Sequence, residues 1–509
     1  MTVIAIRTEA SRTIGVGHAM RCLTLAAALR ERGAQVHFIC REYDGNCNEI
    51  IEARGFAVHR LPATGNAAVA WSGPDWPEEA AQTRAAIDAL GALGVQPAWL
   101  IVDHYAIDEK VERELRSGVG RIMAIDDLAN RNHDCDLLLD QNLVPRMERR
   151  YEELVTSDCV QLLGPRYCLL QPLYVELRNQ TRPRVGAIRR VFAFFSGADV
   201  DNLTQLAIGA FLRHSRSDVE LDVVITSAHP RADSIRAQVA DHPNIHLHVD
   251  LPTLAPLLAK ADLAIGAGGT TSWERACLGV PSLMITMADN QRPIAEALNE
   301  RGIARWLGHK DQITEASLAA ALDAVLRQEL DGSWSELCYA TVDGGGAARV
   351  CNAMLISAST RLRARPAGAQ DEALLLEWAN DPLTRRNAFS SDPIAPQSHR
   401  EWFRARLSRP HSCLIFVVET EAGVPVGQVR FDREHDYWEI DYGVAAELRG
   451  RGLARPMMEV ALDALRATTA GAQVQGRVKQ ANVPSQRVFE RLGFSSQVDE
   501  RGFVYRRKA

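Results

Sequence analysis

The sequence predicts an α/β protein in which two doubly wound lobes, each a parallel sheet covered by helices, precede a separate α+β domain. Three observations support this prediction. The 509 residues are enough for about three domains. Short, uniformly apolar runs alternate with amphipathic stretches up to about residue 356, and such runs are typical of parallel strands buried on both faces. Beyond that point the chain becomes richer in arginine and its apolar pattern changes.

The composition is that of an ordinary soluble globular protein, with 46% hydrophobic and 24% charged residues. Its formal net charge of -6 argues against a nucleic-acid or anionic-membrane partner, because both require a basic surface. The ten cysteines show neither paired spacing nor a metal-ligand pattern, which favours a reducing cytoplasm. No apolar run reaches the roughly 18 residues of a membrane span. We therefore expect a cytoplasmic protein whose partners are neither nucleic acid nor an anionic membrane.

The first lobe is predicted over residues 1–182. A glycine loop follows its first strand, and a helix with apolar residues at helical spacing then runs from about 19 to 32, ending before Gly33. Several of its strands end in carboxylates. The predicted strands are 3–6, 36–39, 99–103, 121–125 and 136–140.

The second lobe is predicted over residues 183–356, after a connector rich in proline and arginine. It alternates strands with helices, such as the helix expected at 201–212. Ligands of doubly wound sheets bind at the carboxyl ends of the strands, so we expect the site in a cleft between the lobes. The predicted strands are 191–195, 223–225, 245–249, 263–265 and 282–285.

The third domain is predicted over residues 360–509. An early helix is followed by runs at 414–419, 427–431 and 438–444 that are typical of antiparallel strands. This order of elements indicates an α+β domain.

The loop between the first strand and first helix contains a candidate catalytic base. Gly15 and Gly17 carry no side chains that would hold a phosphate or sugar at a distance, and backbone N–H groups at a helix start favour anions. The imidazole of His18 can deprotonate water near neutral pH. The same pattern alone also fits a histidine that lies in a turn by chance.

A second glycine-rich turn occurs where the strand at 263–265 runs into a helix. Its N–H groups and hydroxyls suit a pyrophosphate, and Glu274 can accept hydrogen bonds from ribose hydroxyls, although an acid in a first helical turn also simply favours the helix dipole. Two such turns, one in each lobe, favour a nucleotide-sugar site. The residues of this turn are Gly268, Gly269, Thr270, Thr271 and Ser272.

Several short motifs within residues 1–356 together carry a family resemblance. They are 14–21, 102–105, 125–128, 140–142, Ser196, Asp199, Asn202, Thr204, 268–274 and 289–291. In combination they resemble the UDP-sugar hydrolase family of pseudaminic acid biosynthesis (PseG family), which is similar in fold to the GT-B glycosyltransferases and especially to MurG. The resemblance implies a GT-B-like pair of Rossmann-type lobes that hydrolyses UDP-2,4-diacetamido-2,4,6-trideoxy-beta-L-altropyranose to UDP and free sugar.

The resemblance also implies roles for individual residues. His18 would be the catalytic base, and Tyr105 and Asn290 would line the sugar site. No metal is implied. The pair Asp134 and Asp136 looks like a metal-binding motif but leads directly into an apolar run, so we interpret it as a strand entrance. Asp103 and Asp126 end strands that face the expected cleft, and we interpret them as structural acids of turns; the alternative is that one of them orients His18. The predicted substrate and UDP ligands are Gly15, Gly17, Arg21, Gly268, Gly269, Thr270, Thr271, Ser272, Glu274 and Gln291.

The third domain carries a loop at 449–454 that opens an apolar-periodic helix and can cradle an anion. With the segments 482–485 and 489–494 it resembles the GNAT acetyltransferases, which implies acetyl-CoA as acetyl donor. The predicted cofactor ligands are Val444, Arg449, Gly450, Arg451, Gly452, Leu453, Ala454, Asn482 and Ser485.

One position departs from that family. Many members place a tyrosine where this chain has Phe489, and a phenyl ring cannot protonate the departing CoA thiolate. Water or another tyrosine would have to serve instead. Glu439 and Asp441 are candidates for the base that accepts the amine proton, and an exposed charge pair is the alternative interpretation.

The segments 374–382 and 385–387 resemble GNAT enzymes that include the amino-sugar acetyltransferase of the same pathway (PseH), and ribosomal-protein acetyltransferases share them. The fusion favours a bifunctional enzyme that acetylates a UDP-4-amino sugar and hydrolyses a UDP-sugar one step later. Alternatives are a GT-B glycosyltransferase fused to a protein N-acetyltransferase, and a non-catalytic nucleotide-sugar sensor.

Overall fold

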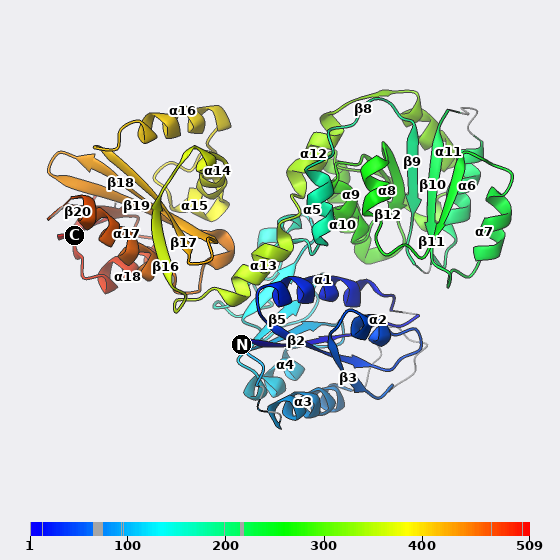
Figure 1. Ribbon diagram of the computed structural model, residues 1–509, viewed down its shortest axis with the longest axis horizontal. Coiled ribbons are helices and arrows are strands. Elements are labelled where there is room, and N and C mark those ends of the chain that lie inside the picture. Colours follow the sequence, from blue (N-terminus) through cyan, green and yellow to red (C-terminus); the bar gives the residue numbers. More distant parts are fainter. Residues whose placement is uncertain are drawn as a thin grey trace. The chain divides into compact units, whose positions relative to one another are not determined.

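The computed structural model describes residues 2–12, 14–64, 75–92, 94, 96–197, 199–213, 218–469, 471–500 and 502–508. The chain divides into two compact units, Met1–Cys351 and Asn352–Ala509. The division falls inside helix α13 (Gly346–Leu355), close to the boundary expected after residue 356. The first unit contains both predicted lobes, each with its own sheet (Figure 1).

The first lobe is a seven-stranded sheet in the order β3-β2-β1-β4-β5-β6-β7, and all neighbouring strands are parallel. Because the chain proceeds outward in opposite directions from β1 and from β4, the topological switch point lies between these two strands, and ligands of such sheets bind there. The strands are β1 (Val3–Thr8), β2 (Gln35–Arg41), β3 (Ala57–Leu61), β4 (Trp99–Asp103), β5 (Arg121–Ile125), β6 (Leu137–Asp140) and β7 (Val160–Leu163).

Helices cover both faces of this sheet. Helices α1 (Gly17–Glu31) and α2 (Asn48–Ala53) lie on one face, and α3 (Trp76–Ala92) and α4 (Glu109–Leu115) on the other (Figure 1). Apolar residues of α3 and α4 form one core with side chains of the central strands, because those strands are apolar on both faces.

The second lobe is a six-stranded parallel sheet in the order β11-β10-β9-β12-β13-β14, with its switch point between β9 and β12. The strands are β9 (Arg190–Phe194), β10 (Glu220–Ile225), β11 (Ile245–Val249), β12 (Leu263–Ala267), β13 (Ser282–Thr286) and β14 (Arg305–His309). The helices are α6 (Leu203–Leu212), α7 (Ala232–Val239), α8 (Ala255–Lys260), α9 (Thr271–Cys277), α10 (Arg292–Glu300) and α11 (Glu315–Leu326).

Residues from the end of the first lobe pack into the core of the second. Leu143, Val144 and Tyr174 belong to the same apolar cluster as Phe192 and Trp273. The unit also contains α5 (Pro172–Arg178), α12 (Ser333–Thr341) and a two-stranded antiparallel ribbon of β8 (Val185–Ala187) and β15 (Glu329–Asp331).

The second unit is a seven-stranded mixed sheet in the order β16-β17-β18-β19-β20-β22-β21, in which only β19 and β20 are parallel neighbours. The strands are β16 (Leu362–Pro366), β17 (Cys413–Thr420), β18 (Pro425–Glu434), β19 (Tyr437–Val444), β20 (Gln473–Val478), β21 (Ser495–Asp499) and β22 (Gly502–Lys508). The helices are α14 (Glu372–Asn380), α15 (Pro382–Asn387), α16 (Pro396–Leu407), α17 (Ala454–Thr468) and α18 (Val483–Arg491).

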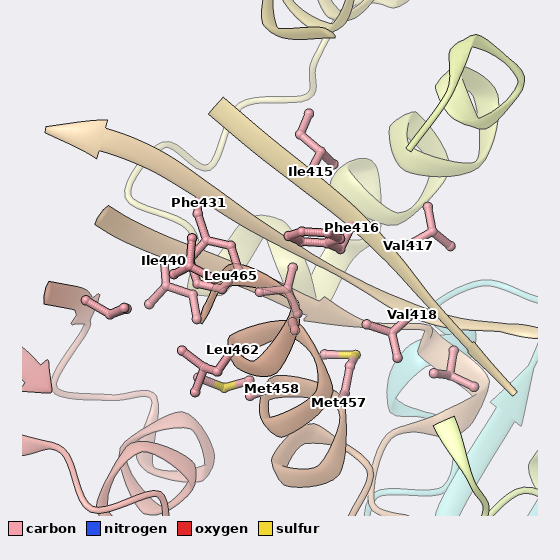
Figure 2. Close-up of a cluster of buried hydrophobic side chains, with 14 of the residues drawn as sticks. Ile415, Phe416, Val417, Val418, Phe431, Ile440, Met457, Met458, Leu462 and Leu465 are labelled. Carbon is pink, nitrogen blue, oxygen red and sulfur yellow. The ribbon is translucent and has the colours of Figure 1, made fainter. Parts of the chain in front are cut away.

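Helix α17 supplies the centre of this unit's core. Its residues Met457, Met458, Leu462 and Leu465 are buried against the sheet, where Phe431 is among the side chains they meet (Figure 2). Spacings of three and four residues place these side chains on one helical face, which explains the apolar period read from the sequence. The predicted fold class, two doubly wound lobes followed by an α+β domain, is therefore confirmed.

Candidate functional site

His18 lies at the switch point of the first sheet, where β1 ends and α1 begins. Gly15 has a φ of +81°, a conformation that favours glycine, and a Cβ atom at Gly15 or Gly17 would meet nothing within 4 Å. His18 is 9% exposed, and its Nδ1 lies 2.5 Å from Oδ1 of Asp103, the last residue of β4. The two neighbouring strands thus bring the predicted base and a carboxylate together.

The neighbours of His18 determine which ring nitrogen carries the proton. Nη2 of Arg21 lies 3.1 Å from Nδ1, and an arginine can only donate. The carboxylate oxygen of Asp103 is closer, and it can only accept, so Nδ1 must carry the proton that bonds it. In the neutral ring, a proton on Nδ1 leaves the lone pair on Nε2, which is the arrangement that a general base requires.

Asp103 is an ionised partner. Burial alone would raise the pKa of Asp103, but the charge of Arg21, together with hydrogen bonds from Arg21 and His18, holds it well below its usual range. Of the two interpretations of Asp103, the structure favours the one in which it orients His18 over the structural acid, because this carboxylate contacts the predicted base directly. Its position in the sequence at a strand end did not reveal which loop it would meet.

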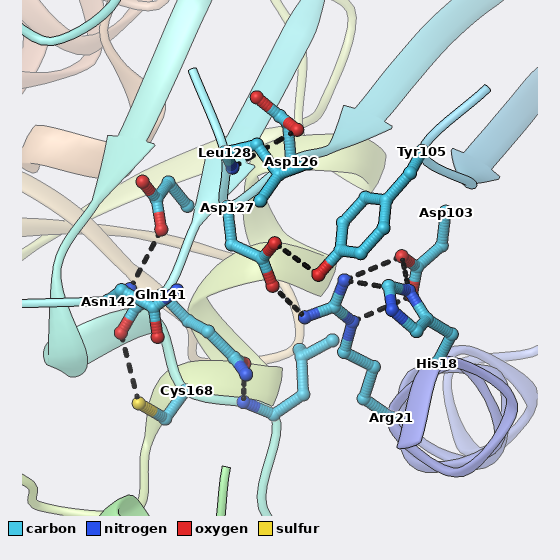
Figure 3. A network of polar contacts seen from close by, with 12 residues as sticks. His18, Arg21, Asp103, Tyr105, Asp126, Asp127, Leu128, Gln141, Asn142 and Cys168 are labelled. Atoms are coloured by element: carbon cyan, nitrogen blue, oxygen red, sulfur yellow. Dashed lines mark hydrogen bonds and ion pairs between the residues drawn. The ribbon is translucent and has the colours of Figure 1, made fainter. Parts of the chain in front are cut away.

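Tyr105 and Arg21 belong to the same cluster (Figure 3). The Tyr105 ring packs edge-on against His18 with centroids 4.8 Å apart, and its hydroxyl donates to Oδ1 of Asp127 at 2.6 Å. Arg21 bonds Asp103 at 2.6 and 2.7 Å and Oδ2 of Asp127 at 3.0 Å. Arg21 was predicted to bind substrate, whereas its guanidinium joins two carboxylates of the site.

Asp127 is a site residue that the sequence reasoning did not single out. It follows β5 within the motif 125–128, so the signal was its place after a third neighbouring strand. Asp126 points elsewhere, as expected of a structural acid: it accepts from Arg131 at 2.7 Å and from the backbone N–H of Ala129 at 2.9 Å.

The glycine-rich turn of the second lobe follows β12 at that sheet's switch point. A Cβ atom at Gly268 would lie 3.3–3.4 Å from Met284, Gln291 and Thr286, so the turn has little room for a side chain. Gly269, Thr270 and Thr271 complete the turn before α9. Ser272 is engaged internally, because its hydroxyl donates to the carbonyl of Ala267 at 3.4 Å and accepts from Arg275 at 3.0 Å.

Glu274 has the character expected of a ligand-binding carboxyl. Burial raises its pKa to about 7, against an opposing hydrogen bond from Tyr174. Its Oε2 is buried and has no hydrogen-bond partner among the residues that the structure describes. A buried oxygen without a partner costs free energy unless a ligand hydroxyl satisfies it, which fits the predicted contact with ribose.

The turn after β13 contributes the last predicted residues of the first unit. The side chain of Gln291 accepts from the backbone N–H of Met287 at 2.9 Å and lies beside Gly268. Asn290 is exposed in the adjacent 3₁₀ turn. The structure thus groups His18, Arg21 and Tyr105 in the first lobe, and the Gly268 turn with Gln291 in the second.

The sheet of the second unit opens beside the predicted acetyl-CoA loop. Pairing of β19 with β20 ends at Ile440 and Gly476, so the part of β19 up to Val444 has no partner on β20. Gly450 and Gly452 have φ values of +73° and +72°, which favour glycine in the loop that enters α17 at Leu453 and Ala454. An open strand edge leading to a glycine loop fits an elongated anionic ligand.

The arginines of this loop bond to the protein itself. Arg449 contacts Oδ1 of Asp381 at 2.7 Å, and Arg451 donates to the carbonyl of Ala353. Asn482 caps α18 by accepting from the backbone N–H of Ser485 at 3.3 Å. These contacts give the three side chains structural roles, so the loop backbone is what can meet an anion.

Phe489 is buried between two tyrosines. Its ring stacks on Tyr505 with centroids 5.0 Å apart and meets Tyr442 edge-on at 6.1 Å. The Tyr442 hydroxyl lies 2.9 Å from Oγ of Ser485, and burial raises its pKa to about 12, so it stays protonated. Tyr442 therefore places a proton-bearing group at the open edge of β19.

The two candidate bases differ in their surroundings. Burial raises the pKa of Glu439, which lies 3.4 Å from Arg477 and accepts from Gln475 at 3.2 Å. Asp441 is exposed and pairs with Arg430 at 3.5 Å. Glu439 has the environment that suits a base, and Asp441 fits the exposed ion pair that was the alternative interpretation.

Asp134 and Asp136 both contact Arg116, at 3.0 Å each, and Asp136 also accepts from the backbone N–H of Ile122. These contacts hold the start of β6 in place, as their position before an apolar run indicated.

Among the described residues, no group of three or more histidine, cysteine, aspartate or glutamate side chains could hold a metal ion. No described helix combines the length and apolar character needed to cross a membrane.

Comparisons with known proteins agree with the order of the two units. Residues 361–495 match the family model of the Acetyltransferase (GNAT) domain. The UDP-2,4-diacetamido-2,4,6-trideoxy-beta-L-altropyranose hydrolase of Campylobacter jejuni is 24% identical over 311 residues, which cover 60% of this chain and 96% of that protein. The expected combination of a region similar to this hydrolase with a GNAT domain is confirmed.

Two further proteins match a larger share of the chain. An uncharacterised protein of Methanocaldococcus jannaschii is 21% identical over 501 residues, or 96% of each chain. The crystal structure of MurG from Acinetobacter baumannii has a TM-score of 0.49 and 15% identity, covering 69% of this chain and 99% of that one.

Proposed function

We propose that the first unit hydrolyses a UDP-activated amino sugar, with His18 as the base that activates water. The observation that carries this proposal is the 2.5 Å contact between Nδ1 of His18 and Asp103 at the switch point. A carboxylate on Nδ1 fixes the tautomer whose Nε2 can take a proton. The Campylobacter relative is a hydrolase of UDP-2,4-diacetamido-2,4,6-trideoxy-beta-L-altropyranose, and we take this UDP-sugar as the substrate.

In the proposed reaction, Nε2 of His18 removes a proton from water as its oxygen bonds to the anomeric carbon. The bond from that carbon to the diphosphate oxygen breaks, and UDP leaves with the electron pair. The turn at Gly268, Gly269, Thr270 and Thr271 faces the diphosphate, and the buried oxygen of Glu274 accepts from the ribose. Positioning and general-base catalysis then supply most of the rate.

We further propose that the second unit transfers acetyl from acetyl-CoA to the 4-amino group of a UDP-amino sugar. The match to the GNAT family model and the open edge of β19 support acetyl-CoA use. Glu439 accepts the amine proton. The Tyr442 hydroxyl donates a proton to the departing thiolate, which the Phe489 ring cannot do. The product amide and free CoA then leave.

An NMR time course of the full chain with this UDP-sugar and no acceptor tests the hydrolase. The proposal expects UDP and free sugar to appear together in equal amounts. UDP release that requires an added alcohol would instead identify a glycosyltransferase, and binding without turnover a nucleotide-sugar sensor. Mass spectrometry of the UDP-4-amino sugar with acetyl-CoA tests the transferase, for which a ribosomal protein is the competing acceptor.

A further inference from the structure

The hydroxyl of Tyr105 donates its hydrogen bond to another side chain of the protein. It donates a hydrogen bond to Oδ1 of Asp127 at 2.6 Å, a short distance of the kind that a carboxylate acceptor gives. Burial and the charge of Asp127 both raise the pKa of Tyr105, so the hydroxyl keeps its proton.

Asp127 is itself fixed from two sides. Nη1 of Arg21 bonds its second oxygen at 3.0 Å, and Arg21 is anchored by Asp103. Arg150 donates to the backbone carbonyl of Asp127 at 2.9 Å. Rotating the Tyr105 hydroxyl toward a ligand would therefore leave a positioned carboxylate oxygen without its proton donor, which is costly in a partly buried site.

We propose that Tyr105 acts as a hydrogen-bond acceptor toward the substrate and so selects sugars that present an N–H or O–H group beside the reacting carbon. A hydroxyl whose single proton is committed can only accept from a further partner. In this assignment Asp127 is a positioning residue: it accepts the hydrogen bond of the Tyr105 hydroxyl, so that the Tyr105 oxygen acts as an acceptor toward the substrate. This inference rests on the proposed hydrolase function.

The chemistry of the selected group follows from this acceptor role. An acetamido group would meet Tyr105 through its N–H and not through its carbonyl, and a ring hydroxyl would meet it as donor. An ether, or an amide methylated on nitrogen, has no proton to offer at that point. The edge-on packing of Tyr105 on His18, with centroids 4.8 Å apart, places this contact next to the proposed base.

Calorimetric measurement of binding to the full-length His18→Asn variant tests, without turnover, whether Tyr105 accepts a hydrogen bond from the substrate. The probes are UDP-2,4-diacetamido-2,4,6-trideoxy-beta-L-altropyranose, its 3-O-methyl ether and the two analogues methylated on one amide nitrogen. We expect at least one blocked probe to bind about 10- to 100-fold more weakly than the parent. Adding Tyr105→Phe should weaken the parent and reduce that difference to less than about threefold.

Asp127→Asn, again in the His18→Asn background, separates the hydrogen-bonding role of the Tyr105 hydroxyl from the steric effect of its ring. An asparagine amide can donate to the Tyr105 oxygen and release the hydroxyl proton, so discrimination against the blocked probe should disappear while the aromatic ring remains. Asp134→Asn is the matched control: it also removes a carboxylate paired with an arginine, but outside this cluster, and discrimination should persist.

Equal binding of the parent and all blocked probes would overturn the proposal, as would discrimination that survives Tyr105→Phe or Asp127→Asn. The two proposals can fail separately. If blocked probes bind more weakly only when both Tyr105 and Asp127 are present, but the wild-type protein releases no UDP, this inference holds and the hydrolase function is refuted. If the wild-type protein releases UDP but all probes bind equally, the hydrolase function holds and this inference is refuted.

Discussion

At the residue scale, each unit places a candidate reacting group beside a neighbour that determines where the proton of that group lies. Asp103 fixes the tautomer of His18, and Asp127 commits the proton of Tyr105. In the second unit, Ser485 holds the hydroxyl of Tyr442. Neighbours of this kind come from distant parts of the chain, so a sequence motif names the reacting group more readily than its partner.

Tyr442 provides a residue-scale prediction for the acetyltransferase. Tyr442→Phe keeps the ring but removes the proposed proton donor, so acetyl transfer at neutral pH should fall by about 100-fold. Tyr505→Phe is the matched control, because Tyr505 also packs on Phe489 but its hydroxyl faces Glu490. Steady-state rates of CoA release would show the difference, and equal losses in both variants would refute the assignment.

His133 provides a prediction about stability and pH. It is buried, 2.8 Å from Glu112, and 3.8 Å from Asp126, which acts as a nearby charge. Burial alone would lower its pKa, but the two carboxylates raise it from 6.5 to about 9. A pKa that rises on folding stabilises the protein below the unfolded value, and this stabilisation is lost as pH rises through 9.

The comparison of wild type with His133→Gln isolates this contribution. The difference in their free energies of unfolding should shrink by up to about 3 kcal/mol between pH 6 and pH 10. Denaturant titrations of the two proteins at several pH values measure it. A difference that stays constant over this range, or grows, would show that His133 is not held charged by its neighbours.

At the scale of elements, the central strands could be predicted from the sequence because they are apolar on both faces. In the two parallel sheets, the structure adds β3, β7 and β14, which are three of the four edge strands; the fourth, β11, was predicted. The three strands that were missed have polar or exposed positions, as in β3, where Ala57 and Arg60 are exposed. They therefore lack the uniform apolar run that marks a buried parallel strand.

The opening between β19 and β20 was not foreseen, because the register of strand pairing is not visible in one sequence. The loop that follows β19 was foreseen, since its glycines and the apolar period of α17 are local signals. The same contrast holds for the first site: the His18 loop is local, and the Asp103 and Asp127 contacts depend on which strands become neighbours.

Gly476 provides a prediction at this scale. A Cβ atom there would lie 2.4 Å from Cζ of Phe489, which is buried, so Gly476→Ala should destabilise the second unit by about 1–3 kcal/mol. Gly443→Ala on the neighbouring strand is the matched control, because its Cβ would meet nothing within 4 Å. Chemical unfolding measures both variants, and equal stabilities would contradict the packing described for Phe489.

At the scale of the whole molecule, the division within α13 determines where the chain can be cut. Ile356 belongs to the core of the second unit, and the carbonyl of Ala353 accepts from Arg451. A fragment of residues 352–509 should therefore transfer acetyl and be about 2 kcal/mol or more stable than a fragment of 360–509. Denaturant unfolding of the two fragments tests this, and equal stability would refute it.

In the proposed hydrolase, Asp103 makes His18 the base for UDP release. The most direct measurement is the rate of UDP release by wild type, His18→Asn and Asp103→Asn, with UDP binding and unfolding measured for each. We predict that both variants bind UDP but release it at least about 100-fold more slowly, because one lacks the base and the other favours the wrong tautomer. A folded His18→Asn variant that releases UDP at the wild-type rate would show that His18 is not the base.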